Sequence, residues 1–95
     1  MDTKVNSFLH YLSTEKGSSK NTLDAYRNDL RGFNNFLNDA NIDKSNNVAI
    51  KKLTKGTIES YVKWLNSREY SRATIARKIA AVKSFVSYLI ETGDL

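Results

Sequence analysis

Apolar residues recur in steps of three and four along four stretches of the chain, which is the spacing of one face of an α-helix. Between the second and third stretches, residues 41–47 are rich in Asn, Asp and Ser, so we expect a loop there. No alternating apolar and polar run is long enough to predict a sheet. The pattern predicts an all-α fold, a compact four-helix bundle that forms one domain over residues 1–95.

Each predicted helix carries an apolar stripe about 100° wide, so each needs the others to bury it. We interpret the tyrosines outside the stripes, and Trp64, as core or core-edge aromatics, and His10 as a surface residue. The predicted core stripes are Val5, Phe8, Leu9 and Leu12; Leu23, Tyr26, Leu30, Phe33 and Leu37; Ile58, Tyr61, Val62 and Leu65; and Ile75, Ile79, Val82, Val86 and Leu89.

Local signals predict where the helices begin and end. Gly17 is suited to end the first helix in the left-handed conformation, and the fourth helix should end near Gly93. The second helix should run over residues 19–40. Thr54 and Ser71 are the predicted N-caps of the last two helices, because each follows an apolar residue and precedes another by four positions, as in a hydrophobic staple.

Two of the predicted helices open with polar and basic residues. The second begins Ser19-Lys20-Asn21-Thr22, and the fourth begins Ser71-Arg72-Ala73-Thr74. A helix N-terminus that carries hydroxyls, unpaired N–H groups and nearby cations is suited to bind phosphate.

The charge balance also favours a polyanionic partner. The chain has 15 Lys and Arg against 10 Asp and Glu, a net charge of +5, which suits nucleic acid or an anionic membrane surface. It has no cysteine, which excludes disulfides and thiolate metal sites. No apolar run approaches the roughly 20 residues of a membrane span, and no signal peptide is visible. We expect a cytoplasmic domain.

The second helix has a basic strip beside its apolar stripe. Lys20, Arg27 and Arg31 fall within about 40° of one another on the helical wheel, and Asn34 continues the strip. Asp24 dilutes it. An ordinary solvated face, with a pair between Asp24 and Arg27, remains an open alternative.

The fourth helix has an outer face of small residues around Arg77, namely Ala73, Ala76, Ala80 and Ser84. Small side chains let another backbone approach, as a helix in a DNA groove requires. The alternatives are that alanine is a good helix former, or that this face packs against a protein helix.

A reaction centre is not visible in the sequence. The single histidine and the absence of cysteine give no metal-ligand cluster, and the four glycines are isolated, so no phosphate-binding loop is formed. We expect no catalytic residues, no metal and no cofactor.

Taken together, these residues resemble the N-terminal core-binding domain of tyrosine recombinases, the phage integrases and Xer-type enzymes, over essentially the whole chain. The matching segments are Phe8-x-x-Tyr11-Leu12, residues 15–30, Phe33-x-x-Phe36-Leu37, Leu53-Thr54, residues 71–85 and Tyr88-Leu89.

The resemblance implies a SAM-like four-helix domain that clamps one face of a recombination-site duplex for DNA integration and recombination. It implies that the catalytic domain is separate and absent from this chain, so this part is no enzyme, although its parent would break and rejoin DNA strands. The parent would be tetrameric on DNA, this domain alone monomeric, and neither a membrane nor a small-molecule substrate is expected. The DNA-binding residues carried over by position are Lys20, Asn21, Thr22, Tyr26, Arg27, Ser71, Arg72, Thr74, Arg77, Lys78 and Lys83.

Most of these contacts should reach phosphates, with Arg77 the best candidate for a base edge. A helical protein-interaction module that uses the small-residue face of the last helix is the alternative function. A helix-turn-helix regulator with its turn at residues 67–70 also stays open.

Overall fold

The computed structural model describes residues 2–39 and 55–94, and these are built almost entirely from helices. The predicted loop at residues 41–47, the Thr54 cap and the end of the second helix at Ala40 lie outside the described residues. The all-α prediction is confirmed, since no strand occurs in either described range. The helices are α1 (Asp2–Glu15), α2 (Lys20–Asp39), α4 (Lys55–Ser67) and α5 (Arg72–Glu91).

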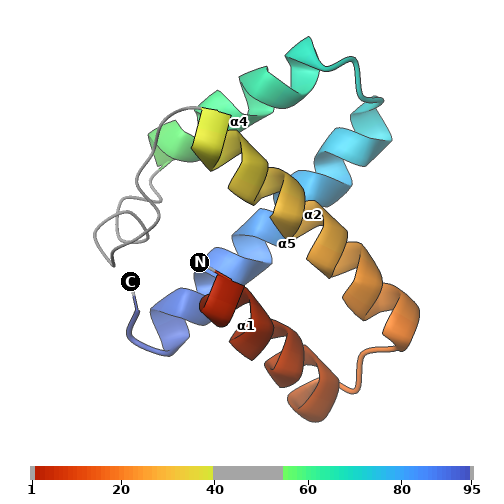
Figure 1. The fold of residues 1–95 in the computed structure, drawn as a ribbon, viewed down its shortest axis with the longest axis vertical. Coiled ribbons are helices and arrows are strands. Elements are labelled where there is room, and N and C mark those ends of the chain that lie inside the picture. The colour runs from red at the N-terminus through yellow and green to blue at the C-terminus, as the bar shows by residue number, and fades with distance from the viewer. Residues whose placement is uncertain (1, 40–54, 95) are drawn as a thin grey trace.

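The four helices of the described residues form two antiparallel pairs that cross each other (Figure 1). In one pair α1 leads into α2, and in the other α4 leads into α5. The crossing brings α2 against α5 at the centre of the molecule. As a result α2 and α5 begin on the same side, the right of the view, and end on the left.

Aromatic rings fill the space around this crossing. Phe8 of α1 lies 5.6 Å from Phe85 of α5 between ring centroids, and Phe33 of α2 lies 5.0 Å from Tyr61 of α4. Phe85, which the stripes omitted, is fully buried. The buried residues are Phe8, Leu9, Leu12, Leu30, Phe33, Phe36, Leu37, Tyr61, Leu65, Ala81, Val82, Phe85 and Leu89.

The predicted edge residues divide into those that pack on the core and one that does not. Trp64 and most of the tyrosines are half-buried against it, and His10 is exposed, as predicted. The expectation for Tyr70 is wrong: its side chain is 43% exposed, and the Lys78 ammonium lies 5.2 Å from its ring centroid. Tyr70 stays outside because it belongs to the turn that leads into α5 rather than to a helical face.

Both predicted glycine stops are confirmed. Gly17 has φ +62°, and Gly93 has φ +82°, a conformation that an L side chain rarely adopts. At the second stop the Asp94 N–H donates to the Leu89 carbonyl at 2.8 Å and the Gly93 N–H to the Ile90 carbonyl at 3.1 Å, which is the Schellman arrangement.

The beginning of α1 and the end of α5 are tied together. The Lys4 ammonium donates to Asp94 at 2.8 Å, and this hydrogen bond, with a second from Thr92, holds the pKa of Asp94 below its ordinary value. Both chain ends therefore lie on the side opposite the beginnings of α2 and α5 (Figure 1).

Candidate nucleic-acid interface

α2 and α5 begin with the same capping arrangement. The Thr22 N–H donates to Ser19 Oγ at 3.2 Å, and the Ser19 hydroxyl donates to Thr22 Oγ1 at 3.0 Å. Ser71 and Thr74 repeat both bonds at the same distances. Ser71 is thus the N-cap of α5, as predicted, and the Ser-x-x-Thr spacing explains the likeness of the two ends.

Each cap leaves donors available in the first turn. The first two helical N–H groups have no carbonyl within the helix to bond, which here means residues 20 and 21 in α2 and residues 72 and 73 in α5. Each threonine hydroxyl accepts a bond from its serine, so its own proton is not used in that pair. Lys20 and Arg72 are exposed beside these donors, which suits both helix ends to an anion.

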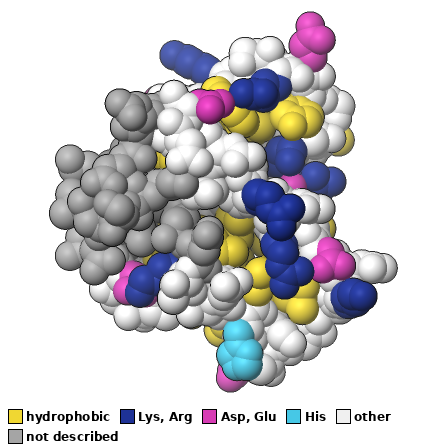
Figure 2. Space-filling view, viewed as in Figure 1, with side chains coloured by type: hydrophobic (Ala, Val, Ile, Leu, Met, Phe, Trp, Pro, Cys, Tyr) yellow, Lys and Arg dark blue, Asp and Glu magenta, His cyan; other side chains and the backbone are white. Residues whose placement is uncertain are grey.

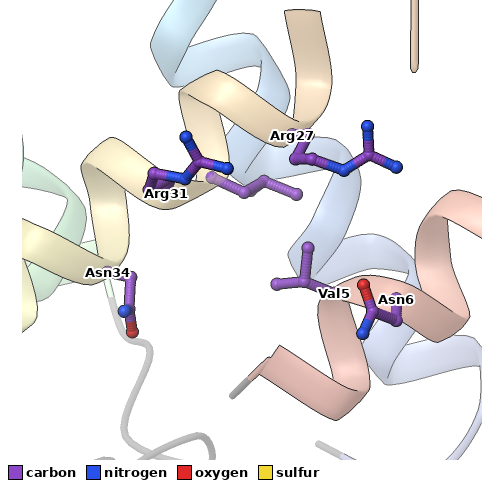
Figure 3. A pocket seen from close by; sticks show the side chains of 6 residues that line it. Val5, Asn6, Arg27, Arg31 and Asn34 are labelled. Carbon is purple, nitrogen blue, oxygen red and sulfur yellow. The ribbon is translucent and has the colours of Figure 1, made fainter. Parts of the chain in front are cut away.

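The basic strip of α2 faces a hollow beside α1. Arg27, Arg31 and Asn34 line a pocket of about 290 Å³ together with Val5 and Asn6 of α1. Figure 3 shows Arg27 and Arg31 leaving the same side of α2 above the α1 residues. Arg27, Arg31 and Asn34 therefore share one side of α2, as predicted, whereas Lys20 does not line this pocket.

The two arginines of this strip differ in their partners. Arg27 pairs with Asp24 at 3.0 Å, as the solvated-face alternative foresaw, although both side chains stay about half exposed. Arg31 is exposed and has no ion pair within the described residues. Arg31 is not among the predicted contacts, although it lies one helical turn after Arg27 and shares its face of α2.

The small face of α5 is also where the sequence placed it. Ala73, Ala76 and Ala80 are exposed, and Ser84 is half-buried. Arg77 is exposed, but its guanidinium also binds a residue of α2. Its Nε and Nη2 donate to the two carboxylate oxygens of Asp29 on α2, at 3.2 and 3.0 Å.

Asp29 has a structural role that was not predicted from the sequence. It is 2% exposed and accepts a third bond from the Lys78 ammonium at 3.2 Å. Lys78 is thereby drawn inward, with a side chain only 12% exposed. The carboxylate therefore links α2 to α5.

Most of the predicted contact residues are accessible, and three are less so. Tyr26 is half-buried, with its ring 5.7 Å from that of Phe8, and Thr74 is half-buried at the α5 cap. Lys78 is nearly buried. The remaining predicted contacts are exposed: Lys20, Asn21, Thr22, Arg27, Ser71, Arg72, Arg77 and Lys83.

Several accessible cations lie along one part of the surface. Figure 2 shows Lys and Arg side chains in a line down the half of this face that lies over α2 and the beginning of α5. Within the part of the chain that the structure describes, no three His, Cys, Asp or Glu side chains are grouped to hold a metal ion. None of the described helices is both long and apolar enough to cross a membrane.

A family model, described as the phage integrase N-terminal SAM-like domain, matches residues 5–93. The chain belongs to this family. Curated relatives also match over most of the present chain. The tyrosine recombinase XerC of Herpetosiphon aurantiacus is 37% identical over 94% of this chain, and XerC of Listeria monocytogenes is 37% identical over 87%. XerD of Shewanella oneidensis is 30% identical over 99%.

The chain spans less than a third of the length of these relatives. It spans 28% of the Herpetosiphon protein, 26% of the Listeria protein and 29% of the Shewanella protein. A search of solved structures gives no significant match. Membership of the family agrees with the four-helix fold.

Proposed function

We propose that this chain is a duplex DNA-binding module of a site-specific tyrosine recombinase, and that it grips one side of the recombination-site duplex. Its relatives are named as tyrosine recombinases, which supports a role in DNA recombination. The catalytic steps would belong to a part of the parent protein with no counterpart in these residues. The domain then contributes affinity and orientation, not chemistry.

The observation that carries this proposal is the pair of identical helix caps on one side of the molecule. Ser19 and Ser71 hold the first turns of α2 and α5 in the same geometry, each beside an exposed cation. The N–H groups of two such turns can each bind one phosphate oxygen, with the positive end of the helix dipole behind them. Two separate phosphate sites on one side fit a sugar-phosphate backbone better than a single small anion.

We assign the exposed basic residues along α2 and α5 to the phosphates of the duplex. These contacts fix the position of the domain without reading sequence. The exposed alanines of α5 leave room for the DNA to approach the helix backbone. The proposed phosphate contacts are Lys20, Arg27, Arg31, Arg72, Arg77 and Lys83, supported by Asn21, Thr22, Ser71 and Thr74.

A salt titration of DNA affinity tests the proposal. Each phosphate neutralised contributes about −0.9 to the slope of log K against log salt, so six contacts predict a slope of about −5. Fluorescence anisotropy with a labelled duplex of mixed sequence, at salt concentrations from about 50 to 200 mM, measures that slope. A slope near zero, or no binding to duplex at the lowest salt, would contradict the proposal.

Paired charge reversals locate the surface. Glu in place of Arg72 and Lys83 should weaken binding far more than Glu in place of Lys16 and Lys63, which are also exposed but lie on other helices or turns. Equal losses from the two pairs would mean that only net charge attracts the DNA. Binding to a partner protein with no salt dependence would favour the protein-interaction alternative.

A further inference from the structure

The buried carboxylate at the crossing of α2 and α5 needs an explanation beyond stability. Asp29 is the only charged side chain among the fully buried residues that the structure describes. Burying a carboxylate carries a desolvation cost, and a well-packed apolar residue often holds two helices as well as an ion pair does. The position of its partner Arg77, at the edge of the proposed DNA surface, suggests a second role.

Asp29 binds the arginine from one side only. It accepts from Arg77 Nε at 3.2 Å and from Nη2 at 3.0 Å, which occupies two of the five guanidinium N–H donors. Both N–H groups of Nη1 and the second one of Nη2 have no other acceptor within the described residues. The Arg77 side chain is 58% exposed, so this outer edge lies open to solvent.

A guanidinium held in this way is oriented to bind a second anion, such as a phosphate. Its planar outer edge can donate two parallel bonds to a phosphate group. A mobile arginine loses rotamer freedom when it forms such bonds, whereas the Asp29 carboxylate has already restricted this one. The neighbouring Ala73 and Ala80 place no bulky side chain beside it.

We propose that Asp29 is a positioning residue of the DNA site: it orients the Arg77 guanidinium so that its outer edge donates to a backbone phosphate of the bound duplex. This inference rests on the proposed function and extends it from a charged surface to one preorganised contact. Asp29 touches no DNA; it acts through Arg77.

The variant Asp29→Asn separates positioning from simple charge, because the two roles predict opposite signs. The substitution keeps the size of the side chain and removes one negative charge near the surface. If Asp29 only reduces the positive field, the variant should bind DNA more tightly. If Asp29 orients Arg77, the asparagine amide group places N–H donors opposite the guanidinium donors, so the paired bonds that hold Arg77 are lost. DNA binding should then weaken about fivefold.

Asp24→Asn is the matched control. It makes the same charge change on the same helix, and Asp24 also pairs with an arginine, but that pair is exposed. We expect it to tighten binding slightly. A double-mutant cycle adds a second control: in an Arg77→Ala background, Asp29→Asn should no longer weaken binding and should strengthen it as Asp24→Asn does.

The readout is anisotropy of the labelled mixed-sequence duplex, with circular dichroism to establish that each variant is folded. If Asp29→Asn does not fold, Arg77→Lys replaces it, since Arg77 is 58% exposed and lysine keeps the charge without the planar fork. That variant should bind about fivefold more weakly with an unchanged salt slope. Tighter binding by Asp29→Asn, or wild-type binding by Arg77→Lys, would overturn the positioning role and leave the proposed function intact. Absence of wild-type binding would overturn both.

Discussion

Lys78 offers the clearest test of how the structure changes the expected interface. The sequence placed this residue among the DNA contacts, but its side chain is 12% exposed and donates to Asp29 at 3.2 Å. Its ammonium also lies 5.2 Å from the ring centroid of Tyr70. We therefore expect Lys78→Met to affect stability and to leave the salt dependence of DNA binding unchanged.

The size of the stability loss follows from these two contacts. A hydrogen bond to a charged group contributes about 1.5–3 kcal/mol, and an exposed cation–π contact about 0.5 kcal/mol. Methionine keeps the apolar stem of the lysine, and Asp29 keeps both bonds from Arg77, so the low end of the range applies. With the cation–π contact included, a loss of about 2 kcal/mol in a domain of this size lowers Tm by roughly 8–16 °C.

Lys83→Met provides the comparison. Lys83 lies on the same helix and is exposed, and no ion pair of this side chain occurs in the described part of the chain. The Lys83→Met variant should have a slope of log K against log salt that is about 0.9 less steep than that of the wild type, with no change in Tm. Thermal unfolding followed by circular dichroism and anisotropy at two salt concentrations measure both quantities. A reduced slope with normal stability for Lys78→Met would refute the assignment of Lys78 to the interior.

Three further substitutions test packing and backbone. Tyr61→Phe should raise the free energy of unfolding by about 1 kcal/mol in urea titrations, because the buried hydroxyl has no partner among the described residues; destabilisation would reveal one. Burial raises the pKa of Tyr61, so the wild type should lose stability as pH rises above about 10, and the phenylalanine variant should lack that part of the loss. Glu69→Gly should stabilise by roughly 0.5–1 kcal/mol, since Glu69 has φ +62°; an unchanged urea midpoint would argue against strain there. Phe85→Ala should cost about 3–5 kcal/mol in the same assay, and a cost below about 1 kcal/mol would mean that the core collapses around the gap.

The elements of the fold followed from local rules. Helix ends were predictable at Ser71, Gly17 and Gly93 because a cap serine and a left-handed glycine act on their own neighbours. The apolar stripes were predictable because helical spacing alone decides which side chains share a face. The omission of Phe85 was avoidable, since it lies three positions after Val82 and four before Leu89.

The link between α2 and α5 was harder to predict because it depends on tertiary contact. One signal was present: Asp29 lies three positions from Tyr26 and four from Phe33, inside an apolar stripe. Lys78 has the same relation to Ile75 and Val82 in α5. Opposite charges within two core stripes indicate a buried pair, but the choice of Arg77 as the second partner depends on the angle at which the helices cross.

The bond between Lys4 and Asp94 has a practical consequence for measurements on this domain. It keeps the two attachment points for a dye, a tether or a fusion partner next to each other, behind the face where α2 and α5 begin. A label added at either extremity should report on a bound duplex without obstructing it, and immobilisation through one extremity should leave the opposite face accessible.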